Sequence, residues 1–200
     1  MIKLNIGCGG SPLENYVNID QDSLLDLRKR YPNKIFNDGL IIKNYDIFNL
    51  PYENGSISEV NADGLLEHLS FKEEPLFLRE VFRVLKIGGI FQFSVPDFEA
   101  TCRAWLSAED KWYDFYSDTE EAISREHWFG TNTYDYKTRW GYIMATFYGS
   151  QNGPGQYHKN GYSISKIQSM LSIIGFKSIN CSVFRWRDNR DYMIQTIATK

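Results

Sequence analysis

The sequence predicts an α/β fold in which a doubly wound, mostly parallel sheet ends in an antiparallel C-terminal strand and carries an aromatic-rich helical insertion. Strand-like and helix-like segments alternate over residues 1–96, which is typical of parallel strands joined by crossover helices. Two strand-like segments at about 176–183 and 192–198 follow each other without a helix, so we expect them to pair antiparallel. The long segment between these regions fits neither pattern.

Turn and cap residues predict where the elements begin and end. A helix begins after Ser23 and is ended by Pro32, and another spans about 71–86, with Gly88-Gly89 as its stop. The last helix begins near Ser163 and is capped by Gly175. The remaining expected strands are residues 3–6, 16–20, 39–46, 57–62 and 90–95.

Residues 97–162 form the segment that departs from the alternation. It holds four of the five tryptophans and ends in the glycine-rich stretch "GSQNGPGQYHKNGY". Structureless loops of this length are uncommon in compact domains. We therefore expect a mostly helical insertion or lid over 97–162, with its own small aromatic core, within a single domain that spans residues 1–200.

Composition narrows the class of protein. With 42% hydrophobic residues and no apolar run near the roughly 18 residues that span a bilayer, the chain is not expected to insert into a membrane. A net charge of −3 offers no electrostatic support for a nucleic-acid partner. Cys8, Cys102 and Cys181 show no C-x-x-C spacing, so we expect reduced thiols and no metal site. No secretory signal pattern follows Met1, which predicts a cytoplasmic location.

The first glycine turn lies in "KLNIGCGGSPLENYVNID", residues 3–20. A dinucleotide-binding turn needs a third glycine and the N-terminus of a full helix to hold a pyrophosphate. Here Pro12 stands where that glycine would be, and there is room for only about one helical turn. The turn therefore disfavours a nicotinamide oxidoreductase and favours a ligand that lacks a pyrophosphate.

Two carboxylates follow the next two expected strands. Asp20 ends the second strand and Asp46 the third, and the carboxyl ends of strands near the switch point of a doubly wound sheet meet at one crevice. Asp20 can accept hydrogen bonds from two ribose hydroxyls, and Asp46 can accept one from the exocyclic amine of adenine. The sequence thus predicts an adenosine-containing ligand without phosphate.

The segments "LNIGCG", "NID", "DIFNLPYENGSISEV", "LLEHL" and "EVFRVLKIGG" resemble, in order and spacing, the class I S-adenosylmethionine-dependent methyltransferases, whose fold is Rossmann-like. The resemblance implies S-adenosylmethionine as cofactor, with Gly7 and Gly9 near its methionine part. It implies that Asp20 binds ribose and that Asp46, with the backbone of Ile47, reads adenine. The chain departs from the family pattern in the nearly absent helix between the first two strands.

Two further residues complete the expected cofactor site. Cys8 lies inside the glycine turn, where its small size suits the position better than a nucleophilic role, since no base is near it in sequence. Asp63 follows the strand expected at 57–62.

His158, in "GPGQYHKNGYS", is the expected general base or the group that orients the acceptor hydroxyl, because its unperturbed pKa of about 6.5 suits proton transfer at neutral pH. A histidine that only ties its loop to the following helix is the alternative. Asp97, at the end of "SVPD", and His127, in "REHWFG", are rivals for the catalytic role. Glu67-His68 either reach the active site or organise the turn into the next helix.

The leading function is S-adenosylmethionine-dependent methylation of a small molecule or glycan, with a sugar hydroxyl as the expected acceptor. The glycan rests on the resemblance, because short methyltransferases of this build are associated with polysaccharide biosynthesis. The alternative is a non-catalytic, cofactor-binding subunit that regulates or scaffolds a partner enzyme.

Overall fold

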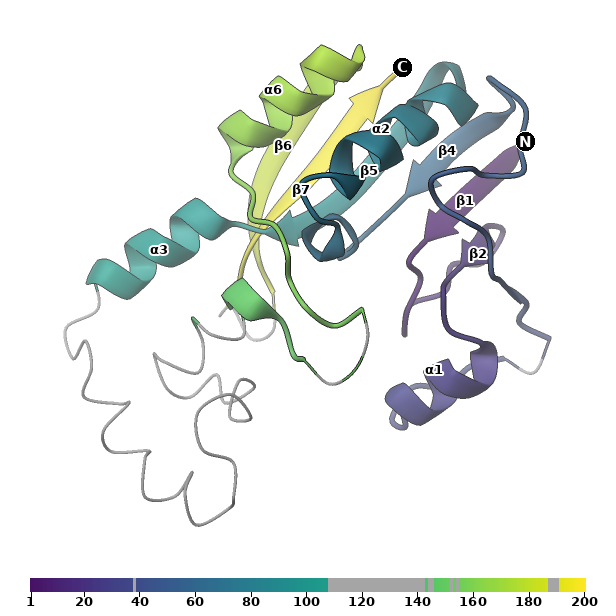
Figure 1. The fold of residues 1–200 in the computed structure, drawn as a ribbon, viewed down its shortest axis with the longest axis horizontal. Coiled ribbons are helices and arrows are strands. Elements are labelled where there is room, and N and C mark those ends of the chain that lie inside the picture. The colour runs from purple at the N-terminus through teal and green to yellow at the C-terminus, as the bar shows by residue number, and fades with distance from the viewer. Residues whose placement is uncertain (38, 108–142, 144–145, 152, 154, 187–190) are drawn as a thin grey trace.

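The structure, a computed structural model, describes all residues except 38, 108–142, 144–145, 152, 154 and 187–190 (Figure 1). In this part of the chain, strands form one seven-stranded sheet in the order β3-β2-β1-β4-β5-β7-β6. The first five run parallel, and β7 pairs antiparallel with both β5 and β6. The predicted fold class is confirmed. The strands are β1 (Ile2–Ile6), β2 (Val17–Ile19), β3 (Ile42–Lys43), β4 (Ile57–Asn61), β5 (Leu85–Pro96), β6 (Lys177–Trp186) and β7 (Asp191–Thr199).

Helices α2 (Glu73–Val84) and α6 (Ile164–Ile174) cover one face of the sheet (Figure 1). Their apolar sides and the inward side chains of β1, β4, β5 and β7 form the main hydrophobic core. The other described helices are α1 (Leu24–Arg30), η1 (Leu66–His68) and α3 (Phe98–Ser107). None of the helices in the described part of the chain is both long and apolar enough to cross a membrane.

The predicted caps are confirmed at the start of α1 and at the end of α6. The Ser23 hydroxyl accepts a hydrogen bond from the backbone N–H of Asp26 and begins α1. Gly175 ends α6 in the left-handed conformation with φ +115°, which an L side chain adopts only with strain. These ends were predictable because a cap depends only on residues within one turn of the helix.

Two predicted boundaries are wrong. The strand expected over 39–46 shortens to β3, at the edge of the sheet. Gly88-Gly89 do not stop α2, because the chain is already extended at Leu85 and continues directly into β5. Gly88 and Gly89 lie instead where β5 shifts register against β4, and their backbone groups pair with those of Lys200. Sequence pattern alone does not reveal a pairing with the distant C-terminus.

The structure describes the two ends of the insertion predicted over residues 97–162. Residue 97 leads into α3, and the described residues between 146 and 162 return beside it, with bridges from Asp97 to Tyr162 and from Gly149 to Tyr157. The rings of Phe98 and Phe147 stack with centroids 4.4 Å apart, which joins the two described ends of the segment. Trp112, Trp128 and Trp140, on which the predicted aromatic core depends, lie outside the described residues, as does His127.

Three buried asparagines form a hydrogen-bonded row across β2, β1 and β4. Strand register places Asn18 and Asn61 on either side of Asn5. Asn61 donates its side-chain N–H to Asn5 Oδ1, and Asn5 donates to Asn18 Oδ1, both at 2.8 Å. Asn18 also makes two hydrogen bonds to the backbone of Leu13, at 2.8 and 3.0 Å, and Asn5 makes one to the carbonyl of Ser11. The row therefore holds the segment after the glycine turn against the sheet.

No helix forms in residues 7–16, so the short link expected between β1 and β2 consists of turns alone. Backbone groups of a loop lack the internal partners that a helix supplies. Here the side chains of Asn5 and Asn18 supply them for Ser11 and Leu13. The asparagine row thus supplies backbone hydrogen bonds to the link between β1 and β2 that a crossover helix would otherwise make internally.

We expect Asn18→Ala to lower the free energy of unfolding by about 2–4 kcal/mol. The N–H of Leu13 and the amide of Asn5 each lose a partner, and the cost stays in the lower part of about 1–3 kcal/mol for each group because the Leu13 contact is only partly buried. Urea denaturation followed by circular dichroism measures the change. Asn44→Ala is the matched control, since Asn44 is exposed and should cost less than about 0.5 kcal/mol. Equal effects of the two substitutions would show that the row is not stabilising.

Candidate active site

The glycine turn is closed by the end of β2. The backbone N–H groups of Gly7 and Cys8 donate to the carbonyl of Ile19 at 2.8 and 3.1 Å, and the N–H of Gly9 donates to Asp20 Oδ2 at 2.8 Å. Gly7 has φ +69°, and a Cβ there would lie 2.9 Å from Leu65 Cδ1. Both the backbone conformation and the lack of space therefore require glycine at position 7.

Asp20 and Asp46 follow adjacent strands, as predicted. The backbone N–H of Asp20 donates to the carbonyl of Lys43, the last residue of β3. Asp20 also accepts from Asp22 N–H through Oδ1, and exposed Asp46 accepts from Phe48 N–H at 2.9 Å. Ile47 is half-buried beside the main core. These residues border the glycine turn and β3 and do not line the cavity described next.

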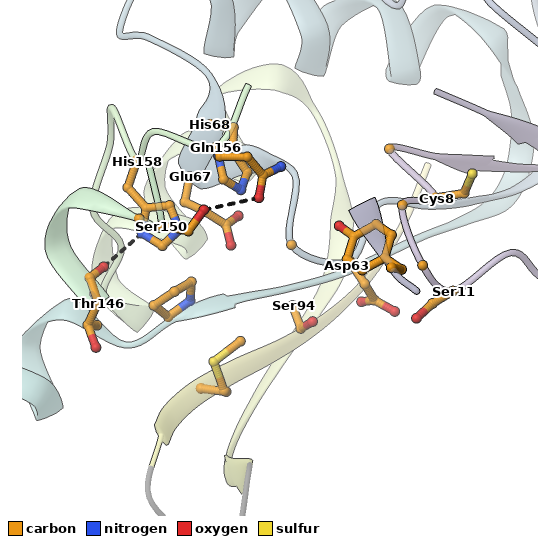
Figure 2. Close-up of a pocket in the computed structure, with 18 of the residues that line it drawn as sticks. Cys8, Ser11, Asp63, Glu67, His68, Ser94, Thr146, Ser150, Gln156 and His158 are labelled. Atoms are coloured by element: carbon orange, nitrogen blue, oxygen red, sulfur yellow. Dashed lines mark hydrogen bonds between the residues drawn. The ribbon is translucent and has the colours of Figure 1, made fainter. Parts of the chain in front are cut away.

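A cavity of about 680 Å³ opens at the carboxyl ends of the strands (Figure 2). Its volume lies within the range of about 300–1,000 Å³ that is usual for small-molecule sites. Gly7, Cys8, Gly9 and Asp63 line it, and so does His158, so the structure brings these predicted residues together. In Figure 2, Cys8 and Asp63 lie toward one side, whereas Glu67, His68 and His158 gather toward the other.

Several lining residues were not singled out from sequence. Tyr31 lies against the glycine turn, where a Cβ on Gly10 would come within 3.0 Å of its ring. Ser94 of β5 and Gln195 of β7 line the cavity from the sheet. Tyr31 follows the end of α1, but nothing in the local pattern places that end beside the first turn. Ser94 and Gln195 are neighbours only through the pairing of β5 with β7.

Glu67 is a buried carboxyl group at the histidine end of the cavity. Its side chain is 5% exposed, and its Oε2 atom has no hydrogen-bond partner among the described residues. Burial, reinforced by the negative charge of Asp63, raises the pKa of Glu67 to about 8. Leaving such an oxygen without a partner is costly, so its presence beside a cavity indicates a functional role.

The two histidines face each other edge to face, with ring centroids 4.9 Å apart. His68 Nδ1 lies 3.0 Å from the carbonyl of Tyr157, and His158 Nδ1 lies 2.8 Å from that of Thr146. A carbonyl oxygen only accepts, so Nδ1 carries the proton in each neutral ring and Nε2 keeps a free lone pair. Burial lowers the pKa of both rings, to about 4 for His68, which keeps them uncharged at neutral pH.

Backbone hydrogen bonds hold this end of the cavity in place. The N–H groups of Lys159 and Asn160 both donate to the carbonyl of Glu67, at 2.7 and 3.2 Å, and His158 N–H donates to the carbonyl of Tyr148. The segment 157–160 is thereby fixed against η1. Glu67 and His68 form η1 before α2 and also line the cavity, so the structure does not choose between the two interpretations of this pair.

Asp97 has a structural role in the described residues. Its Oδ1 atom accepts from the N–H of Ala100 at 3.0 Å, and its carbonyl accepts from Thr101, which makes it the N-cap of α3. It is buried and does not line the cavity, although its neighbour Pro96 does. Its position directly after β5 predicted that Asp97 would lie near the reacting groups. Its side chain instead forms a hydrogen bond with the first turn of α3.

Cys8 packs its side chain with Leu27 and Phe36 in a second, smaller apolar cluster. Burial, with a smaller contribution from the charge of Asp20, raises the pKa of the Cys8 thiol to about 12. The nucleophilic form of cysteine is the thiolate, which is therefore scarce at neutral pH. These surroundings agree with the expectation that Cys8 is present for its size.

We expect iodoacetamide at pH 8 to alkylate Cys8 at least about a hundredfold more slowly in the folded protein than in the same chain unfolded in guanidinium chloride. The raised thiol pKa and the buried position both reduce thiolate availability. Mass spectrometry of the Cys8 peptide over time measures both rates. Similar rates in the two states would contradict the buried position of the thiol.

The comparisons with known proteins concern the N-terminal part of the sequence and the overall fold. Residues 4–93 match the family model described as a methyltransferase domain. No curated protein matches the chain by sequence. The matched residues include the glycine turn, Asp20, Asp46, Asp63 and η1, which are the cofactor residues expected above and one wall of the cavity.

Three solved structures share the fold at low sequence identity. An S-adenosylmethionine-dependent methyltransferase from Archaeoglobus fulgidus is 14% identical, with a TM-score of 0.59, over 99% of this chain and 85% of that one. One from Thermotoga maritima is 12% identical, with a TM-score of 0.56, over 100% and 81%. The 1,6-didemethyltoxoflavin-N1-methyltransferase of Burkholderia thailandensis, solved with S-adenosylhomocysteine, is 10% identical, with a TM-score of 0.57, over 100% and 70%. The methyltransferase-domain match over residues 4–93, with the fold that the whole chain shares with these enzymes, indicates an S-adenosylmethionine-dependent methyltransferase with S-adenosylmethionine as its cofactor.

Proposed function

We propose that this methyltransferase acts on a hydroxyl group of a small molecule or glycan, with a sugar as the acceptor. The observation that carries the proposal is one cavity that joins the glycine turn to uncharged imidazole groups at its other side. The first region suits the cofactor and the second suits an acceptor hydroxyl. The absence of a C-x-x-C pair and the separate, free cysteines support a cytoplasmic location.

In the reaction, the bond between the methyl group and the sulfonium sulfur breaks while a bond to the acceptor oxygen forms. S-adenosylhomocysteine leaves as a neutral thioether, and the hydroxyl proton is released. The protein must align the two reactants and help the proton to leave. His158 Nε2 has a free lone pair that can accept a hydrogen bond from the hydroxyl, which supports a role as base or as orienting group.

The cofactor is proposed to lie along the glycine turn and the adjacent strand ends. Gly7 and Gly9 allow its methionine part to approach the backbone, beside Cys8 and Asp63. Asp20 then binds the ribose hydroxyls. Asp46, with the backbone of Ile47, reads the adenine.

The polar and aromatic residues of the cavity support a sugar as acceptor. Sugar hydroxyls need many hydrogen-bonding partners, and sugar faces pack well on aromatic rings. Ser94, Gln156 and Gln195 bring hydroxyl and amide groups to the cavity, and Phe184 and Tyr192 bring rings. An acceptor from polysaccharide biosynthesis, such as a nucleotide sugar, matches this set.

Isotope-labelled S-adenosylmethionine tests the proposal with a panel of nucleotide sugars, polysaccharide fractions and small phenols. We expect label in a sugar product, with one S-adenosylhomocysteine formed for each methyl group transferred. Transfer to nitrogen acceptors alone would reject the hydroxyl proposal. Tight cofactor binding without transfer to any acceptor would favour the regulatory or scaffold subunit.

We expect Asp20→Ala to weaken S-adenosylmethionine binding by about 2–3 kcal/mol, or about 30- to 150-fold, because a charge-assisted acceptor for the ribose is lost. The substitution also removes the partner of Gly9 N–H in the turn. Titration calorimetry measures the affinity, and Asp46→Ala should cost less since one neutral amine loses one acceptor. A larger effect of Asp46→Ala would show that ribose and adenine are placed wrongly.

We expect His158→Ala to lower turnover by about a hundredfold or more while cofactor affinity stays within about twofold. The substitution removes the group that faces the acceptor and leaves the glycine turn intact. Lys159→Ala is the matched control, because its exposed side chain points to Glu73 and its backbone hydrogen bond is retained. A His158→Ala enzyme with most of its turnover would reject His158 and leave His127, since Asp97 caps α3 and does not line the cavity.

A further inference from the structure

Glu67, His68 and His158 bring three electron-pair donors to one place in the cavity. One ligand atom from each residue lies within 4.8 Å of those from the other two. The residues come from η1 and from the returning segment 157–160, which backbone hydrogen bonds hold together. Figure 2 shows the three side chains gathered on the same side of the cavity.

Among the described residues, one carboxyl oxygen of Glu67 has no hydrogen-bond partner, and each imidazole keeps a ring nitrogen with a lone pair. Glu67 is only 5% exposed, and the oxygen without a hydrogen-bond partner among the described residues is its Oε2 atom. Both imidazoles use their Nδ1–H groups on backbone carbonyls, so their Nε2 atoms present lone pairs. The neighbouring cation Lys159 lies 3.6 Å from Glu73 instead. Such a set lacks a positively charged partner.

We propose that Glu67, His68 and His158 bind a divalent transition-metal ion of the Zn²⁺ type. Two imidazoles and one carboxylate are a ligand set that such ions accept, whereas Mg²⁺ and Ca²⁺ prefer oxygen ligands alone. Metal-binding histidines usually donate their second ring N–H to a carbonyl or carboxylate, which fixes the ring. His68 and His158 both do so, to Tyr157 and Thr146.

The distances require only local adjustment. Ligand atoms around a tetrahedral zinc ion at about 2.0–2.1 Å from the metal lie about 3.4 Å apart. The three donors must therefore approach by up to about 1.4 Å from their present separation of up to 4.8 Å. Because the Nδ1–H hydrogen bonds hold both rings, the approach falls to the Glu67 side chain and to small shifts of segment 157–160 against η1. Three protein ligands leave a fourth position open toward the cavity.

The open position gives the metal a role at the acceptor. An oxygen of the acceptor bound there would be held on the side of the cavity away from Cys8, and the cation would polarise it. With its Nε2 atom on the metal, His158 would orient the acceptor through the ion and would not act as the base. This role rests on the proposed function, whereas the metal site itself does not. The absence of a metal pattern in the sequence is explained by the distance between "LLEHL" and His158 along the chain.

Zn²⁺ binding to the full chain, after treatment with a chelator and desalting, tests the site without any acceptor. We expect about one tightly bound Zn²⁺ per chain by elemental mass spectrometry and a higher melting temperature with Zn²⁺ but not with Mg²⁺. Glu67→Gln and His158→Ala should each weaken binding by about a hundredfold or more, measured by competition with a coloured chelator. Glu99→Gln, an exposed carboxylate on α3, should bind Zn²⁺ as the unmodified protein does.

Binding below one ion per chain, or Zn²⁺ affinity that Glu67→Gln and His158→Ala leave unchanged, would overturn the site. If Glu67→Gln loses its native circular dichroism spectrum, His68→Ala takes its place, because that ring is only half-buried. Methyl transfer at full rate by the metal-free enzyme would overturn the role at the acceptor. It would leave the proposed methylation of a hydroxyl standing, so the two failures are distinguishable.

Discussion

The asparagine row across β2, β1 and β4 is the interaction on which the cofactor half of this molecule depends. Parallel strands ordinarily need a crossover element between them, and this chain links β1 to β2 with turns alone. Asn5 and Asn18 provide the hydrogen bonds that hold Ser11 and Leu13 against the sheet. A buried network of this kind is stabilising only when every member has partners, which ties the three strands to one register.

The consequences of the row extend to the glycine turn. With β1 and β2 in register, the carbonyl of Ile19 meets the N–H groups of Gly7 and Cys8, and Asp20 meets Gly9. The turn is therefore shaped by the strand beside it and not by a following helix. A cofactor with adenosine but no pyrophosphate suits this arrangement, since a helix N-terminus is most valuable for holding phosphate.

The histidine end of the cavity is held in place by backbone hydrogen bonds and not by a row of buried side chains. Short backbone hydrogen bonds from Lys159 and Asn160 to Glu67 join two segments that are remote in sequence. They place a buried carboxyl group beside two imidazoles whose protons are already engaged. A buried carboxyl oxygen without a hydrogen-bond partner costs free energy, and active sites are where proteins tolerate such a cost. This end is consequently better suited to binding than to stability.

The sequence by itself determined the fold class, the helix caps at Ser23 and Gly175 and the residues of the glycine turn. These features depend on periodicity or on neighbours within a few residues of the chain. Only the tertiary structure decided which side chains share the cavity. It brought His158 to Glu67 and His68 and assigned Asp97 to the end of α3, while His127 lies outside the described residues. It also placed Gly88-Gly89 inside β5 through their pairing with Lys200. Contacts between remote segments depend on how the strands and loops meet in space, and no local pattern of residues carries that information.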